Sequence, residues 1–141
     1  MAALTVTTTV VKSATSQPQS GVLGSGVTAT AGQYIYLDNS VAPAVIRLSG
    51  AGGTAAQAAV NGCLLTGGTA GQTVLYVSID NAFVPGITGM TASNALWLSV
   101  TSGSITATYA DLTTGNYVNQ IGQVVTATSV NFSPLNSPVQ K

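Results

Sequence analysis

The chain has 141 residues and a formal net charge of zero, with only three basic and three acidic residues and no histidine. Charged residues make up 4% of it, where an ordinary globular domain has about 25%. Scattered cations cannot form the basic surface that binds phosphates, so nucleic acid is excluded as a partner. Without histidine, the chain cannot build a Ser-His-Asp triad, a Cys-His pair or an imidazole metal site.

A soluble monomer normally keeps a net charge of about 2–8 in magnitude. An uncharged chain is therefore expected to lie against other protein surfaces, as part of an oligomer or a larger assembly. No apolar run reaches the roughly 18 residues of a membrane-spanning helix, so no membrane partner is predicted. The first residues, MAALTVTTTVVK, lack the basic and apolar regions of a signal peptide, and none is expected.

Residues 1–27 are predicted to be an N-terminal strand followed by a flexible arm. Valine and leucine alternate with threonine from residue 4 to residue 11, so Leu4, Val6 and Val10 would share one face of a strand and Val11 the other. Residues 13–26, SATSQPQSGVLGSG, have the composition of a surface loop, or of an arm that becomes ordered only against a neighbouring subunit.

Residues 28–132 are predicted to form one β domain, which contains two similar units. These are TAGQYIYLDN at 30–39 and TAGQTVLYVSIDN at 69–81. In each unit glycine permits a tight turn, β-branched and aromatic residues favour a strand, and the Asp-Asn pair can end it. Further strands are predicted at 44–48, 63–65, 95–100, 105–109, 117–125 and 129–132, with a loop at 81–86.

One short helix is predicted at about 54–61, because Thr54 can cap its N-terminus, alanines favour it and Asn61-Gly62 can end it. Residues 133–141 contain two prolines and are predicted to be a C-terminal tail with little order of its own. Many short strands, frequent turns and a single helix indicate an all-β fold, a compact antiparallel β-barrel or sandwich. Tyr34 and Tyr36 alternate with Ile35 and Leu37, so this strand is expected to be covered on both faces.

The few reactive residues predict no catalytic site and no cofactor. Asp38, Asp80 and Asp111 each lie in a turn context, where a capping role is the simplest interpretation. Calcium at the two Asp-Asn pairs is the alternative, although calcium loops usually gather several carboxylates within a dozen residues. Cys63 is the only cysteine, so it cannot form an intrachain disulfide and is expected to be buried. We predict that the protein is not an enzyme.

Three stretches resemble a family of small phage proteins, the head decoration or capsid cement proteins. They are TAGQYIYLD at 30–38, AAQAAVNGCLLTGGTAGQTVLYV at 55–77, and NALWLSVTSGSITATYADLTTGNYVNQIGQVV at 94–125. The resemblance covers about residues 28–130. It implies a non-enzymatic protein, made in the host cytoplasm, that docks as a homotrimer on the outer surface of the capsid and clamps neighbouring subunits of the major capsid protein.

We predict Leu4, Val6, Val10 and Val11 as the candidate capsid-binding residues, because a strand here could add to a sheet edge on the capsid or on a neighbouring subunit. Two alternatives stay open. One is another virion surface component, such as a fibre base. The other is a glycan-binding β-sandwich that uses exposed tyrosine or tryptophan side chains.

Overall fold

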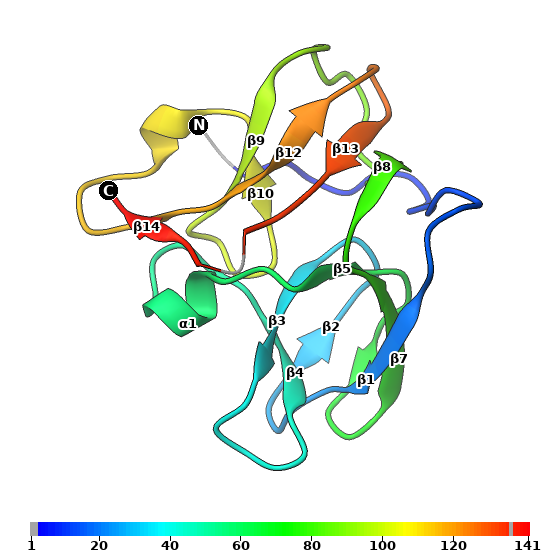
Figure 1. The fold of residues 1–141 in the computed structure, drawn as a ribbon, viewed down its shortest axis with the longest axis vertical. Coiled ribbons are helices and arrows are strands. Elements are labelled where there is room, and N and C mark those ends of the chain that lie inside the picture. The colour runs from blue at the N-terminus through cyan, green and yellow to red at the C-terminus, as the bar shows by residue number, and fades with distance from the viewer. Residues whose placement is uncertain (1–2, 136) are drawn as a thin grey trace.

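The structure is a computed structural model of the chain, and it describes residues 3–135 and 137–141. The fold is all-β, as predicted, and its two main sheets pack in a sandwich-like arrangement (Figure 1). The first sheet has the strand order β1 (Gln19–Val22), β7 (Thr73–Val77), β5 (Gly62–Leu64), β3 (Tyr34–Asp38), β4 (Val45–Leu48). The second sheet has the order β10 (Ile105–Thr106), β9 (Ala95–Leu98), β12 (Gln120–Val124), β13 (Val130–Phe132), β8 (Asp80–Phe83).

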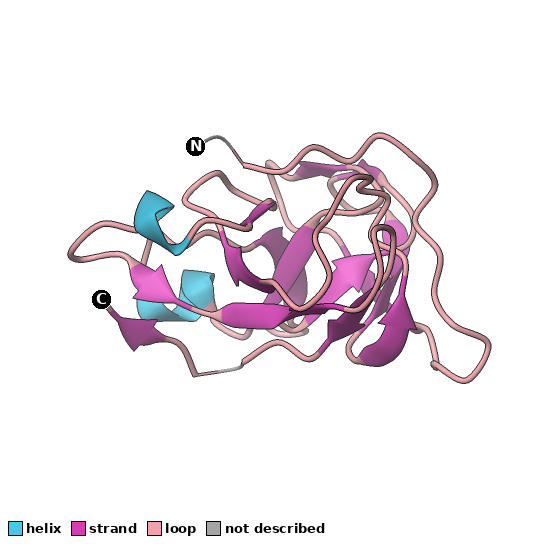
Figure 2. Ribbon diagram, turned by 90° about the horizontal axis from the view of Figure 1, so that it is seen from above, coloured by secondary structure: helices cyan, strands magenta, loops and turns pink. Residues whose placement is uncertain are grey.

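All strand pairs in both sheets are antiparallel, and each sheet comes from one continuous part of the chain. Two small ribbons complete the fold: β2 (Thr28–Ala29) with β6 (Gly68–Thr69), and β11 (Tyr117–Val118) with β14 (Val139–Gln140). The helical turns are α1 (Ala55–Ala58) and the 3-10 turn η1 (Tyr109–Asp111). Both lie on the same side of the molecule as the C-terminus (Figure 2).

The repeated TAGQ sequence is a tight turn with the same hydrogen bonds in both copies. In the first copy the amide of Thr30 donates to Gln33 Oε1 at 2.8 Å, and Gly32 has a φ of 91°. Residues 69–72 repeat the side-chain bond, and residues 113–116, TTGN, do so with asparagine in the last place. The third position needs a positive φ, which glycine adopts without strain. The repeat is therefore a structural unit that starts a strand.

The helix begins as predicted and ends earlier. Thr54 caps it in a capping box with Gln57: Thr54 Oγ1 accepts from the Gln57 amide at 3.3 Å, and Gln57 Oε1 accepts from the Thr54 amide at 2.9 Å. Ala59 is already extended, with φ −66° and ψ 146°. Gly62, expected to end the helix, instead begins β5, where a Cβ would lie 2.7 Å from the carbonyl oxygen of Val77.

Apolar side chains gather in two clusters, on opposite faces of the first sheet. The inner cluster lies where that sheet curls on itself: a parallel bridge joins Leu23 to Ile46, and the Gly24 amide donates to the Ile46 carbonyl at 3.0 Å. Its members are Leu23, Ala29, Ile35, Ile46, Leu64, Val74 and Tyr76. The inter-sheet cluster joins Tyr34, Cys63 and Val77 of the first sheet to Phe83, Leu96, Leu98, Ile105, Ile121, Val124, Val130 and Phe132 of the second.

Strand β3 is buried on both faces, as the alternating residues indicated. Ile35 belongs to the inner cluster and Tyr34 to the inter-sheet cluster, and Tyr36 is also buried. The chain itself supplies the cover on both sides.

The N-terminal part of the chain differs from the sequence prediction. Residues 3–10 form no strand, because their amides bond to separate carbonyls: Thr7 and Thr8 both donate to Gly86, so no ladder develops. Within the stretch interpreted as a flexible arm, Gln19–Val22 form strand β1, which pairs with β7. Backbone pairing at the edge of the first sheet orders a segment whose side chains are mostly small and polar.

Two further segments are more ordered than expected. Asp80-Asn81 was predicted to end a strand, but the chain leaves the first sheet after Val77 and Asp80 begins β8 in the second sheet. Part of the predicted loop at 81–86 therefore lies in a strand. The C-terminal tail contains β14, whose pairing with β11 continues through a 2.7 Å bond from the Lys141 amide to the Asn116 carbonyl.

Candidate protein-docking surface

The four residues that the sequence singled out lie on one extended stretch, residues 3–11, which we call the N-terminal segment. It crosses the second sheet from one edge to the other: the Leu4 amide donates to Ile105 of β10 at 2.9 Å, and Val11 pairs with Val84, just beyond β8. Leu4 and Val10 pack against the inter-sheet cluster. Val6 and Val11 have 37% and 48% of their surface exposed.

Leu4 and Val10 thus anchor the segment, while Val6 and Val11 remain partly exposed. The segment fits closely, because a Cβ on Gly86 would lie 2.5 Å from the Thr8 carbonyl oxygen and one on Gly32 would lie 2.8 Å from Val6 Cγ2. Gly32 and Gly86 therefore let the N-terminal segment approach the backbone. The sequence identified the segment but gave no sign of this contact with the rest of the chain.

Backbone amides along the N-terminal segment fall into two groups. Those of Leu4, Thr7, Thr8 and Val11 donate to carbonyls of the second half of the chain. Those of Thr5, Val6, Thr9 and Val10 have no hydrogen-bond partner among residues 3–135 and 137–141. An extended, exposed segment with unpaired amides offers pairing to an incoming strand. The threonine and valine side chains here are uncharged, so nothing repels such a strand.

Asp38 and Arg47 form an ion pair between β3 and β4. Arg47 Nε donates to Asp38 Oδ2 at 2.8 Å, and the Ser40 amide and hydroxyl donate to Asp38 Oδ1 at 3.0 and 2.5 Å. These bonds, those from Ser40 first and that from Arg47 next, lower the pKa of Asp38 to about 2. The carboxylate therefore ends β3 and starts the turn, as the sequence predicted for this residue.

Asp80, the first residue of β8, binds the start of the linker, residues 12–18, that follows the N-terminal segment. It accepts hydrogen bonds from the Ser13 amide at 2.7 Å and the Ala82 amide at 3.0 Å. Burial opposes ionisation, but these bonds and nearby Lys12 outweigh it, so the pKa of Asp80 lies below its usual value. In the described part of the chain, no three Asp, Glu, His or Cys residues gather where they could hold a metal ion.

Asp111 and Lys141 also act within the fold. The Thr106 hydroxyl donates to Asp111 Oδ2 at 2.7 Å and lowers the pKa of that carboxyl group. Lys141 Nζ donates to the Leu112 carbonyl and lies 4.2 Å from the centre of the Tyr109 ring. These contacts hold η1 and the C-terminus together, and the charges they involve are engaged within the protein.

Tyr34 and Cys63 are buried side by side in the inter-sheet cluster. The Tyr34 hydroxyl has no nitrogen or oxygen partner among the described residues, and the Cys63 thiol is its polar neighbour. Burial raises the pKa of both groups above their usual values, so both stay protonated. A protonated, inaccessible thiol is not a nucleophile. Cys63 is buried, as the sequence predicted.

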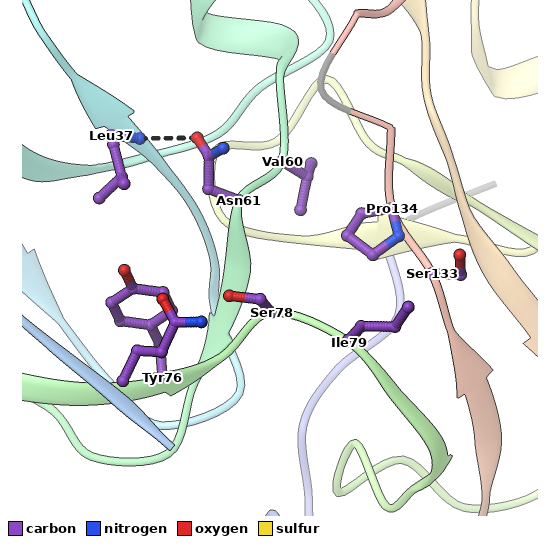
Figure 3. Close-up of a pocket in the computed structure, with 9 residues that line it drawn as sticks. Leu37, Val60, Asn61, Tyr76, Ser78, Ile79, Ser133 and Pro134 are labelled. Atoms are coloured by element: carbon purple, nitrogen blue, oxygen red, sulfur yellow. Dashed lines mark hydrogen bonds between the residues drawn. The ribbon is translucent and has the colours of Figure 1, made fainter. Parts of the chain in front are cut away.

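A cleft of about 330 Å³ opens where the first sheet meets the chain entering β8 and the segment after β13 (Figure 3). Asn61 Oδ1 in this cleft accepts from the Leu37 amide at 2.9 Å, so the amide group supports the backbone. Tyr76 is its only titratable side chain, and burial raises the pKa of that phenol. The lining residues are Gln19, Leu37, Val60, Asn61, Tyr76, Ser78, Ile79, Ser133 and Pro134. The residues that line the cleft therefore include no acid–base pair.

Comparison with known proteins assigns no family: no family model matches the chain, and no curated protein matches it. Neither helical turn in the described residues is long and apolar enough to cross a membrane. The N-terminal segment, with its unpaired amides among the described residues and two partly exposed valines, is therefore the candidate functional site that the geometry itself supplies.

Proposed function

We propose that this chain is a non-enzymatic structural protein of a phage particle. It docks as a homotrimer on the outer surface of the capsid, where it clamps neighbouring subunits of the major capsid protein. The observation that carries the proposal is the N-terminal segment, an extended, uncharged stretch whose Thr5, Val6 and Thr9 amides have no partner among the described residues. The resemblance of residues 28–130 to capsid cement proteins supplies the identity of the partner.

When the capsid protein binds, the N-terminal segment stays packed on its own domain. A strand of the capsid protein pairs with the unpaired amides, while Leu4 and Val10 keep their contacts with the inter-sheet cluster. Each contact of this kind is small, but a trimer on a lattice presents several at once, and linked contacts raise the overall affinity steeply. The near absence of charge fits a surface that is covered by other protein in the particle.

The direct test removes two of the unpaired amides. It keeps the amides of Leu4, Thr7, Thr8 and Val11, which bond within the fold. In the double variant Thr5→Pro/Thr9→Pro, the thermal midpoint should stay within about 3 °C of the parent, since both side chains are exposed and neither amide has a partner among the described residues. Occupancy on purified capsids stripped of this protein should fall about tenfold or more. The matched control is Thr114→Pro, at the second position of the 113–116 turn, which favours proline. Full occupancy by the double variant would overturn docking through this edge.

The trimer is tested separately by native mass spectrometry of the purified protein. A species with the mass of three chains supports the proposal. If the protein were a monomer at every concentration, both in solution and on capsids, the trimer would be excluded. Cryo-electron microscopy of the particle then shows whether density for this chain lies on the outer shell, and its absence from the head would overturn the capsid assignment.

A further inference from the structure

A pocket of about 120 Å³ opens at one end of the inter-sheet cluster, between the N-terminal segment and the loop 86–94. Its apolar lining consists of Leu4, Ile87, Met90, Leu96, Ala107 and Val124. All six residues belong to the inter-sheet cluster or pack against it. The pocket is therefore a place where this cluster is not filled by the chain's own side chains.

The rest of the lining brings the pocket to the surface. It consists of Thr88, Gly89, Thr91 and Asn94, which are exposed residues of the loop 86–94. None of the described residues that line the pocket carries a charge. A charged group that entered it would lose its hydration without gaining a partner of opposite charge. The pocket therefore favours an apolar group that comes from outside.

The loop that forms one wall of the pocket is held at several points. The Gly86 carbonyl accepts from the Thr7 and Thr8 amides, and the Met90 amide donates to the Ala127 carbonyl at 3.2 Å. The Ser93 amide donates to the Val124 carbonyl at 2.9 Å. The wall thus has its shape before any partner arrives, which lowers the entropy lost on binding.

The pocket lies next to the unpaired amides of the N-terminal segment. Leu4, which lines it, is followed by Thr5 and Val6, whose amides have no partner among the described residues. Leu4, Thr5 and Val6 also line a second cavity of about 330 Å³, so there is space beside this part of the segment. A strand that pairs with the segment runs about 4.8 Å from it. Its side chains therefore come within reach of the pocket.

We propose that the pocket receives one aliphatic side chain, of the size of leucine or isoleucine, from the capsid strand that pairs with the N-terminal segment. In strand addition, main-chain hydrogen bonds supply affinity and pockets for alternate side chains supply specificity. An apolar cavity of about 150 Å³ holds one benzene molecule, and the pocket here is slightly smaller. This inference rests on the proposed function and adds the chemistry of the partner: an uncharged extended segment with one aliphatic residue.

Another hollow on the second sheet lacks these features. It has a volume of about 250 Å³, lies on β12 and β13, and is lined by residues that include the exposed Gln120 and Asn131. None of its described lining residues belongs to the inter-sheet cluster or to the N-terminal segment. Of the two, the pocket beside Leu4 combines an apolar lining with a position at the docking segment.

The pocket is tested first without the capsid. The intact protein, labelled with ¹³C in its methyl groups, is equilibrated with xenon, which enters apolar cavities. We expect a saturable shift of the Ile87, Leu96 and Val124 methyl signals. Absence of this shift in the parent protein would show that no apolar group enters the pocket, and it would overturn the inference whether or not the protein binds capsids.

Two variants close the pocket in different ways. Ala107→Leu fills it from within, and Thr88→Met covers it from the exposed rim, so that at least one should fold with a thermal midpoint within about 3 °C of the parent. Both should abolish the xenon shift. Ala56→Leu, at an exposed alanine of α1, is the matched control and should respond like the parent. A xenon shift that persists in a folded closing variant would place the probe elsewhere and overturn the assignment.

The same variants identify the occupant on purified capsids stripped of this protein. Occupancy by the closing variants should fall about tenfold or more, because the capsid side chain loses its pocket, and Ala56→Leu should bind like the parent. Full occupancy by a closing variant, with a loss of occupancy in Thr5→Pro/Thr9→Pro, would overturn this inference and leave the proposed docking intact. A parent protein that does not bind capsids would overturn the proposed function itself.

Discussion

The two sheets enclose their apolar side chains in different ways. The first sheet curls until its edges meet at Leu23 and Ile46, and its inner cluster is filled by aliphatic residues and the Tyr76 ring. The second sheet does not enclose a core of its own. It packs against the outside of the first sheet, where Phe132 lies between Tyr34 and Phe83 with ring centres 5.7 and 5.5 Å apart.

The comparison shows which half of the chain depends on the other. The first sheet and its inner cluster come entirely from residues 19–77, so they include no residue of the second sheet. The second sheet obtains its core from Tyr34, Cys63 and Val77 and from the N-terminal segment. The proposed docking segment packs against this dependent half through Leu4 and Val10, so it requires the inter-sheet cluster to be intact.

The largest expected effect is at the centre of the inter-sheet cluster. Phe132→Ala removes a fully buried ring and should lower the free energy of unfolding by about 3–5 kcal/mol. Ile46→Val, a smaller deletion in the inner cluster, should lower it by about 0.5–1.5 kcal/mol. Urea unfolding followed by circular dichroism measures both. If Phe132→Ala were as mild as Ile46→Val, the second sheet would not depend on this cluster in the way that we describe.

A somewhat smaller effect is expected where both halves meet the C-terminal segment. Asn119 is fully buried, and its Nδ2 donates to Ala58 and Leu135 while its Oδ1 accepts from the Leu135 amide at 2.9 Å. Asn119→Ala leaves these groups without partners and should lower the free energy of unfolding by about 2–3 kcal/mol. Exposed Asn39→Ala is the control. Hydrogen exchange should show the amide of Leu135 losing protection, and unchanged protection would contradict this role.

The first sheet could be predicted from the sequence more completely than the second. The TAGQ turns, β3, β7 and the Thr54 cap all follow from local chemistry, and the structure contains each of them. Strand β8 could not be predicted in the same way, because Asp80-Asn81 resembles the end of a strand and pairs only because β13 lies beside it. β1 and β14 likewise depend on a distant partner strand, which local composition does not reveal.

The candidate functional residues, too, could be predicted from the sequence only in part. Alternation of Val and Thr indicated that residues 4–11 are extended, but only the fold shows which of their amides have no partner among the described residues. Gln120 and Asn131 lie eleven positions apart, and nothing in their local sequence indicates that they line one hollow on β12 and β13. The alternation of Gln120 and Asn131 with the buried Ile121 and Phe132 was the only available signal. It indicates the face of the sheet on which each side chain lies, but not which residues of the next strand lie beside it.

The turns before β7 and β9 allow a further comparison of the two sheets, through one substitution in each turn. Gly71 starts β7 with a φ of 85°, and Ser93 holds the same kind of position before β9 with a φ of 72°. A serine in this conformation is strained by roughly 1 kcal/mol relative to glycine. Ser93→Gly should therefore raise the free energy of unfolding by about 0.5–1 kcal/mol, whereas Gly71→Ala should lower it by a similar amount. Equal and opposite shifts in the urea midpoint would show that the two turns are equivalent, and a loss of stability in Ser93→Gly would show that they are not.

The smallest effect concerns the Asp38–Arg47 ion pair of the first sheet. The pKa of Asp38 is about 2 in the folded chain, below the roughly 3.9 of an unfolded aspartate. Ionised Asp38 therefore stabilises the fold above about pH 4, and this contribution is lost as the pH falls towards 2. The pair with Arg47 is partly exposed, so the effect is modest and weakens with salt. Thermal unfolding of the parent and of Asp38→Asn should differ at pH 6 and converge near pH 2, while a difference that stays constant over this range would assign the role of Asp38 to its hydrogen bonds with Ser40 and not to its charge.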